Sequence, residues 1–366
     1  MENTEIPEGT RRAETGAGPG HECTEAWVVT DSLGQPDCLS QTSQPAVFAV
    51  ENEGVTYQAT PTAAFEAVRS RLFGLAYRML GSRADAEDVV QDTYVRWHQV
   101  DQGVVENAEA WLVTAATRLA IDRLRRLKTE REAYVGPWLP EPLPSDAMMP
   151  DHHLELASDL SIAMLTLLET LAPDERAAFL LHEVFDVEYG RIASILDKTE
   201  AACRQVVHRA RERVRGARKR FDSTESSKIA LLEKFKTAVE ASDEQALLAL
   251  FAPDATWTAD GGGKTAAGPR PLVGVDQIVR LLLGLRRNYW PAGRALQISP
   301  VNGEPGLRLH DGERLTAVLA FDMDGQQIVS VYAVLNPDKL AAGGRSGGVS
   351  QPAPSTVLAD REGGKT

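Results

Sequence analysis

Cysteine is scarce in this chain, and long apolar runs are absent. The 366 residues hold three cysteines, Cys23, Cys38 and Cys203, and no CxxC pair, which argues against a disulfide framework or a zinc site and favours a reducing cytoplasm. No apolar run approaches the ~20 residues that cross a bilayer. The first residues carry Glu2, Glu5 and Glu8, so we expect neither a signal peptide nor membrane association, and no bound metal or cofactor.

Positive charge is also in short supply, because the formal net charge is -13. It is nevertheless concentrated in one place: residues 201–220 hold eight Lys or Arg and a single acid, Glu212. An acidic protein that gathers cationic side chains on one segment is expected to place them against a polyanion.

The chain is long enough for two or three domains. Residues 1–60 hold ten acids and two arginines and predict a disordered acidic tail. Two helical segments, 62–131 and 159–220, are separated by a linker, 132–158, with five prolines. Residues 226–340 begin as helix and continue with strand-like runs at 255–259, 295–299, 315–321 and 328–335, and residues 341–366 predict a second disordered tail. The expected fold is therefore multi-domain, with two all-α domains followed by an α+β domain.

The end of the second helical segment predicts a helix-turn-helix. A short helix, 189–196, is followed by the turn Asp197-Lys198-Thr199, and Thr199 is a natural N-cap for a helix from Glu200. One apolar stripe is expected to be buried. The outward side chains are suited to base edges and phosphates: Glu200, Arg204, Gln205, His208, Arg209 and Arg211. The plain alternative is an arginine-rich solvated face.

The first helical segment carries two further surfaces. The stretch DAEDVVQDTYVRW, residues 85–97, has a mostly negative face that alone would be an ordinary solvated face. It consists of Asp85, Glu87, Asp88, Gln91 and Asp92. The next helix is basic and carries an aromatic that can stack on unpaired bases: Trp111, Arg118, Arg123, Arg125 and Arg126.

These motifs carry a resemblance. DAEDVVQDTYVRW followed by AEAWLVTAATRLAIDRLRR, residues 108–126, resembles region 2 of a sigma-70-family factor, and the helix-turn-helix at 188–215 resembles region 4. Their spacing is that of the extracytoplasmic-function (ECF) class. The linker YVGPWLPEP (134–142) with DGGGK (260–264) and NPDKL (336–340) resembles the SigJ-type subgroup, whose C-terminal domain is SnoaL-like, of the NTF2-like fold.

The resemblance implies a role for each surface. The acidic face of 85–97 would bind the β′ clamp helices of core RNA polymerase, whose β flap would also be a partner. The Trp111 surface would open and hold the −10 promoter element, and the outward face of 200–211 would bind the −35 element. The fused domain would regulate the sigma core, which makes a separate anti-sigma factor less expected. The contact residues would be Trp138, Pro140, Asp260, Gly261, Gly262, Gly263 and Lys264.

Two other functions compete with a sigma factor. A stand-alone helix-turn-helix regulator with a ligand-sensing domain would bind an operator alone, but it leaves the acidic helix without a role. An enzyme of the SnoaL-like kind needs a pocket general base. The candidates Asp254, Asp260 and His310 form no acid–base pair at a recognisable spacing, and an Asp beside glycines is usually a turn residue. We therefore predict a sigma factor and no catalytic residues.

Overall fold

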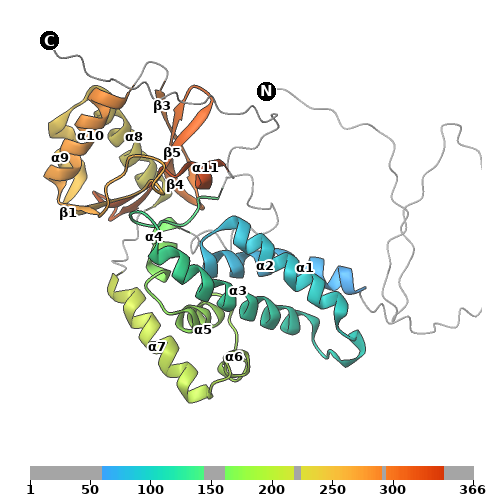
Figure 1. Cartoon of the computed structure of the whole chain (residues 1–366). Helices are drawn as coiled ribbons and strands as arrows, with labels where there is room; N and C mark the ends of the chain where they lie inside the picture. Colours follow the sequence, from blue (N-terminus) through green and yellow to red (C-terminus); the bar gives the residue numbers. More distant parts are fainter. Residues whose placement is uncertain (1–59, 144–160, 218–223, 291–293, 342–366) are drawn as a thin grey trace, which may run out of the picture. The chain divides into compact units, whose positions relative to one another are not determined.

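The computed structural model describes residues 60–143, 161–217, 224–290 and 294–341 (Figure 1). The two predicted tails, most of the proline-rich linker and the cations at 218–220 lie outside these residues. Among the described residues, no helix is long and apolar enough to cross a membrane.

The first helical segment folds into three helices and a short 3-10 turn. They are α1 (Pro61–Leu80), α2 (Arg83–Gln99), η1 (Gln102–Val104) and α3 (Ala108–Glu132). Each α-helix begins at a side-chain cap, because Thr60, Ser82 and Asn107 accept hydrogen bonds from the third residue after them. Gly81 ends α1 at φ 66°, in the left-handed region.

The described part of the second helical segment holds three short helices and a longer one. They are α4 (Ile162–Leu168), α5 (Pro173–Glu183), α6 (Tyr189–Leu196) and α7 (Glu200–Ala217). Pro173 occupies the first turn of α5, as the sequence predicts. One continuous hydrophobic core joins the two segments, since Leu75 and Leu112 belong to the same buried cluster as Leu180 and Val207.

The C-terminal segment is a mixed sheet with helices. Its order is α8 (Glu225–Ala241), α9 (Glu244–Leu250), β1 (Phe251–Asp260), β2 (Leu272–Val273), α10 (Val275–Tyr289), β3 (Arg294–Val301), β4 (Glu304–Asp311), β5 (Arg314–Met323), β6 (Ile328–Val334) and α11 (Pro337–Ala341). The strand order is β2-β1-β6-β5-β4-β3, with β1 and β6 parallel and the other neighbours antiparallel.

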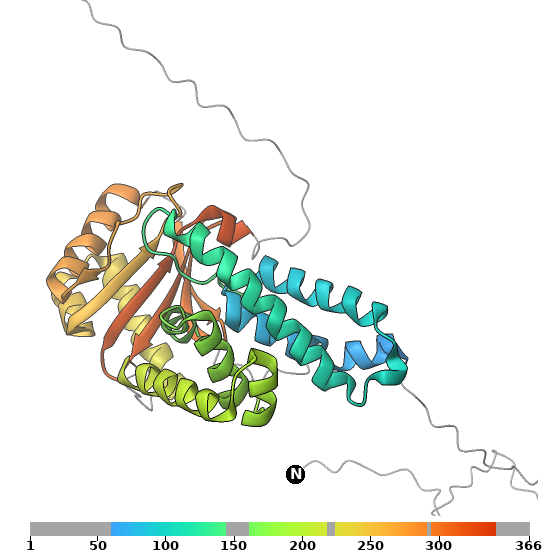
Figure 2. The same ribbon diagram turned by 60° about the horizontal axis from the view of Figure 1, so that its bottom comes forward.

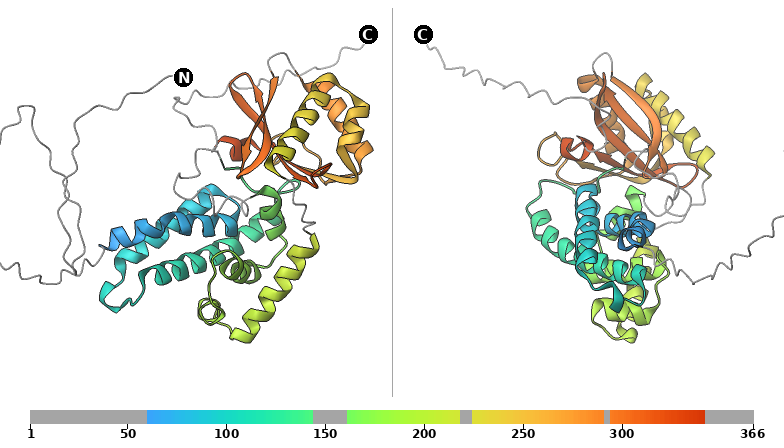
Figure 3. Two further views of the ribbon diagram at one scale, coloured as in Figure 1. Left: turned by 180° about the vertical axis from the view of Figure 1, so that it is seen from behind. Right: turned by 90° about the vertical axis from the view of Figure 1, so that its right-hand side faces the viewer.

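Both faces of this sheet are covered. On β5, Leu319 and Phe321 pack with α8, α9 and α10, whereas Val318 and Ala320 lie on the opposite face. That second face packs against the linker residue Leu139, the start of α4 and α11. Figure 2 shows the sheet between α8–α10 and the helical segments, and Figure 3 shows α4 and α11 beside it.

The sequence predicted the class of each segment, and the structure adds what it missed. The expected α+β character is confirmed. Three of the strand-like runs lie within β1, β3 and β5, and the run 328–335 extends one residue beyond β6. Helix α10 and strands β2 and β4 were not predicted. Strand β4 begins Glu304-Pro305-Gly306, residues that usually mark a turn.

Two glycines give opposite predictions for replacement by alanine. Gly81 has a left-handed φ, and an added Cβ would lie 2.6 Å from the Trp138 ring, so Gly81→Ala should cost about 1–2 kcal/mol or more. Gly284 lies inside α10 with open space around its Cβ position, so Gly284→Ala should add about 0.5–1 kcal/mol. Urea unfolding of the two variants checks the signs, and equal effects would contradict this account.

Candidate functional site

The acidic face of α2 divides into paired and outward carboxylates. Asp85 is half-buried and forms an ion pair with Arg123 of α3 at 2.6 Å. Glu87 pairs with Arg83 one turn earlier at 2.8 Å. Asp88, Gln91 and Asp92 are exposed along the same helix. An outward acidic surface therefore exists, and Asp85 is positioned behind it by the ion pair.

The basic helix α3 directs its side chains to different neighbours. Trp111 is half-buried against Trp97, with ring centroids 5.3 Å apart. Arg118 donates to the carbonyls of Ser194 and Ile195 at the end of α6, at 2.9 and 3.2 Å.

The remaining predicted cations of α3 separate further. Arg125 pairs with Asp174 of α5 at 2.9 Å, and Arg126 is exposed. Arg123 is turned toward α2. The five residues predicted for one DNA surface thus do not share one open face in this arrangement, since the second helical segment engages two of them.

The helix-turn-helix has the predicted local geometry. Asp197 ends α6 at φ 54°, and the Thr199 hydroxyl accepts from the Ala202 N–H at 3.2 Å, which caps α7. The buried stripe consists of Cys203, Val207, Ala210 and Val214. Exposed side chains on the other face are those of Glu200, Arg204, Gln205, His208 and Arg209.

Three of the predicted recognition residues have internal partners. Arg204 pairs with Glu200 at 2.7 Å and lies over the Tyr189 ring. Arg211 forms an ion pair with Glu183 of α5, which raises the pKa of Arg211 and turns the side chain along the domain. The exposed predicted residues consequently lie between Glu200 and Arg209, in roughly the first three turns of α7.

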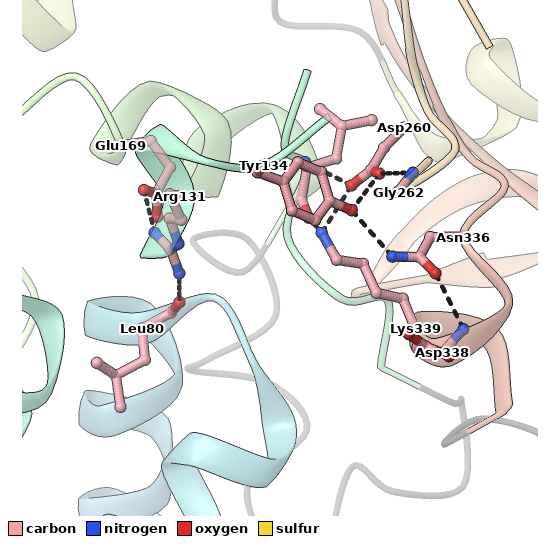
Figure 4. Close-up of polar contacts among 10 residues, drawn as sticks. Leu80, Arg131, Tyr134, Glu169, Asp260, Gly262, Asn336, Asp338 and Lys339 are labelled. Carbon is pink, nitrogen blue, oxygen red and sulfur yellow. Dashed lines mark hydrogen bonds and ion pairs between the residues drawn. The ribbon is translucent and has the colours of Figure 1, made fainter. Parts of the chain in front are cut away.

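The buried carboxylate of Asp260, at the end of β1, is the centre of the contact between the C-terminal domain and the linker (Figure 4). Its Oδ1 accepts from the Tyr134 hydroxyl at 2.6 Å and the Gly262 N–H at 3.0 Å. Its Oδ2 accepts from the Leu139 N–H at 2.9 Å and the Lys339 ammonium at 2.6 Å. Both oxygens are committed to structural donors, so Asp260 is not placed to act as a general base.

The ring of donors around Asp260 is itself fixed. Asn336 donates to the Tyr134 hydroxyl at 2.9 Å. Burial, together with the hydrogen bond to Asp260, raises the pKa of Tyr134 and keeps its hydroxyl a donor. Burial lowers the pKa of Lys339, and the Asp260 carboxylate opposes that shift. Lys339 also lies 4.1 Å from the centre of the Trp138 ring.

The glycines of DGGGK form the turn that closes this site. Gly262 and Gly263 both have positive φ, and a Cβ on Gly262 would collide with the Asn336 amide. Gly261 is buried against the Thr265 carbonyl, and Lys264 pairs with Asp338 at 2.5 Å at the surface. Glycine is required here by backbone conformation and by close approach.

The linker residues 134–143, here called the strap, join the C-terminal domain to α1. Trp138 and Pro140 pack on Gly81 at the end of α1. Arg131 lies over the Trp138 ring, 3.5 Å from its centroid, and donates to the Leu80 carbonyl. Leu143 N–H donates to the Asn302 side chain at 2.8 Å.

Several of these residues were not singled out from the sequence. Tyr134, Glu141, Asn336 and Lys339 lie inside the motifs YVGPWLPEP and NPDKL, so their segments were identified without their roles. Asn302 had a local signal, because Asn-Gly between two strands marks a hairpin.

Comparison with known proteins identifies the family to which this chain belongs. Sigma-70 region 2 matches residues 64–130, and sigma-70 region 4 matches residues 161–214. The ECF RNA polymerase sigma factor SigJ of Mycobacterium tuberculosis is 37% identical over 286 residues, which span 75% of this chain and 91% of SigJ. This chain belongs to the ECF family of sigma factors. The first and second helical segments are hereafter region 2 and region 4.

Structure comparison agrees. The crystal structure of M. tuberculosis SigJ matches with a TM-score of 0.62 at 34% identity, covering 76% of this chain and 98% of that one. Probable SigI of M. tuberculosis is 27% identical and covers 76% of this chain and 94% of its own length. The predicted SigJ type is therefore confirmed, with two helical sigma regions followed by a C-terminal domain that contains a sheet. The chain is a promoter-recognising sigma factor that works with core RNA polymerase, and not an enzyme.

Removal of the Asp260 carboxylate should release the strap. Asp260→Ala leaves the buried Lys339 ammonium and three other donors without their acceptor, and breaking such a pair costs about 3–5 kcal/mol. We expect faster hydrogen exchange at the Leu139 amide and a lower midpoint of urea unfolding. Asp254→Ala, at an exposed position of the same strand, should leave both unchanged. Retained protection of the Leu139 amide in Asp260→Ala would refute the central role of this carboxylate.

Proposed function

We propose that this sigma factor binds polymerase through α2, binds promoter DNA through α3 and α7, and is regulated in cis by its C-terminal domain through the strap. The observation that carries the regulatory part is Asp260, whose buried carboxylate holds two strap residues of the chain that joins regions 2 and 4. Because its partner is core polymerase, the protein is expected to work in the cytoplasm.

The polymerase contact is assigned to the outward carboxylates of α2. Asp88, Gln91 and Asp92 recur along one side of the helix, and Val95, 49% exposed, continues it. The resemblance assigns this helix to the β′ clamp helices and implies the β flap as a further contact of polymerase. Asp85 supports the surface indirectly, since its ion pair with Arg123 ties α2 to α3.

The −35 contact is assigned to the start of α7. Side chains near the N-terminus of a recognition helix reach base edges, and arginines further along meet phosphates. Glu200, Arg204, Gln205 and His208 occupy the first turns, with Arg209 beyond them. Arg211 contributes from the edge of this surface, where Glu183 holds it.

The described arrangement supports a closed state, in which the chain is not ready to bind both promoter elements. Arg118 and Arg125, assigned to the −10 element with Trp111, Arg123 and Arg126, contact α6 and α5 of region 4. The −10 and −35 elements are roughly 25 base pairs apart, a distance of about 85 Å at about 3.4 Å per base pair. Helices in direct contact do not reach across that distance, so region 4 has to move away from α3 before both elements are bound.

The fused domain acts on that equilibrium without a second protein. A tethered regulator has a high effective concentration at its docking site, so a separate anti-sigma factor is not required. The strap contacts the end of α1 through Trp138 and Pro140, while the same sheet face packs on Ile162 at the start of α4. Docking therefore holds both regions at once.

Reconstituted transcription tests the function as a whole. Purified core polymerase is supplied with this protein on its own promoter, and with the Asp260→Ala variant at equal concentration. We expect initiation only when the protein is present, and a changed output with the variant. No polymerase-dependent initiation, together with tight operator binding by the free chain, would contradict the sigma mechanism. Identical output from the variant would contradict the regulatory role alone.

Charge reversal on α2 tests the polymerase surface. Asp88→Arg combined with Asp92→Arg should weaken binding to core polymerase at least tenfold, because like charges at a matched interface are strongly unfavourable. Both side chains are exposed, so thermal unfolding should change little. The matched control is Asp254→Arg, an exposed carboxylate on β1. Equal polymerase affinity for the reversed variant and the control would remove this face from the interface.

A further inference from the structure

Glu141 connects the strap to the polymerase-binding helix. Its side chain is 7% exposed. Its Oε2 accepts a hydrogen bond from the N–H of Arg83, the first residue of α2, at 2.9 Å. Its own N–H donates to the Gly81 carbonyl at 2.8 Å. A residue 58 positions away from Arg83 in the sequence thus caps the N-terminus of α2.

Helix α2 also has a local cap, Ser82, but its hydrogen bond is longer than the one that Glu141 accepts. The Ser82 hydroxyl accepts from the Asp85 N–H at 3.4 Å, beyond the usual 2.7–3.2 Å for such a bond. The first N–H groups of a helix have no partner within the helix, and a carboxylate is favoured there by the helix dipole. Glu141 supplies both the acceptor and the charge.

Two anchors on the C-terminal domain hold Glu141 in place. Asp260 binds the Leu139 N–H, and Asn302 binds the Leu143 N–H, so each anchor lies two residues from Glu141. Asn302 also donates at 2.8 Å to the buried Tyr77 hydroxyl, which donates to the Glu141 carbonyl. The position of the capping carboxylate is consequently fixed from the C-terminal domain.

Release of either anchor frees the strap on one side of Glu141 and weakens the cap, while the bonds of Glu141 to Tyr77 and Gly81 remain. Two residues of extended chain span about 7 Å, whereas a hydrogen bond is lost beyond about 3.5 Å. Burial raises the pKa of Glu141, and the Arg83 N–H opposes that shift. Burial therefore disfavours the charged Glu141 side chain, and hydration favours its exposure to solvent once the strap is released.

We propose that Glu141 is an N-cap supplied by a distant part of the same chain. Through this cap, docking of the C-terminal domain orders the first turn of α2 and strengthens binding to core polymerase. This rests on the proposed role of α2. The carboxylates assigned to polymerase, Asp88 and Asp92, follow within the next turns and stay exposed while the strap is docked. Docking thus supports the polymerase surface and does not cover it, even though region 4 engages the −10 cations.

Hydrogen exchange on the full chain tests the coupling without polymerase. Glu141→Ala and Asp260→Ala should each speed exchange of the first-turn amides of α2 about fivefold, the effect of a lost N-cap. Glu141→Gln retains a side-chain oxygen for the Arg83 N–H but lacks the charge, so its exchange should fall between those of the wild type and Glu141→Ala. Asp254→Ala is the matched control. Unchanged first-turn exchange in Asp260→Ala overturns the proposal, whether or not the chain activates polymerase.

Titration of core polymerase with the same variants gives the second readout. Each single variant, Glu141→Ala or Asp260→Ala, should raise Kd about fivefold. The double variant should also stay near fivefold, because both changes remove one cap. A double variant weakened by the product, about 25-fold, contradicts a shared route. If the wild-type chain fails to bind polymerase, the proposed function fails, and the exchange result still decides the coupling.

Discussion

The contact between the C-terminal domain and the sigma core depends on one buried carboxylate. A charge removed from water is tolerated only when its acceptor sites are filled. The Asp260 carboxylate accepts hydrogen bonds from Tyr134 and Leu139 of the strap, from Gly262 in its own turn, and from Lys339 of α11. If the strap undocks, the Asp260 carboxylate and the Lys339 ammonium therefore both lose hydrogen-bond partners or shielding from water. Trp138 and Glu141 both belong to the strap. The packing of Trp138 on Gly81 and the position of Glu141 therefore follow from this constraint.

The sheet imposes a second constraint that acts in the same direction. Val318 and Val334 form an apolar face opposite the one covered by α8–α10, and Leu139 and Ile162 complete its packing. Exposure of that face would lose hydrophobic burial in proportion to its area. The docked sheet face thus has partners both in the linker, at Leu139, and at the start of region 4, at Ile162. A signal that alters docking acts on regions 2 and 4 together.

Sequence reasoning recovered what local pattern determines. The stripe through Cys203 and Val207 is buried, and Thr199 caps α7, because helix period and capping are local properties. Helix α10 was missed although Ile278 and Leu282 fit helix spacing, since a run of glycines and prolines precedes it. The Asp260 site was beyond local reasoning. Its partner Tyr134 lies 126 residues away, and an Asp beside glycines has the signature of a turn. Resemblance identified the three motifs YVGPWLPEP, DGGGK and NPDKL, and only the fold joined them into one hydrogen-bonded group.

Helix C-termini explain how a closed sigma core is compatible with opening on DNA. Arg118 donates to the carbonyls of Ser194 and Ile195 at the end of α6, and Arg131 and Arg176 donate to Leu80 and Met79 at the end of α1. A helix end presents about half a negative charge, whereas each promoter phosphate carries a full one. Arg176 is buried and also bound to Glu169, so its contact has to persist. Arg118 is exposed, and its exchange from carbonyls to phosphate would strengthen the interaction that it makes. Promoter DNA itself would thereby favour separation of region 4 from α3, while the strap keeps α2 in order.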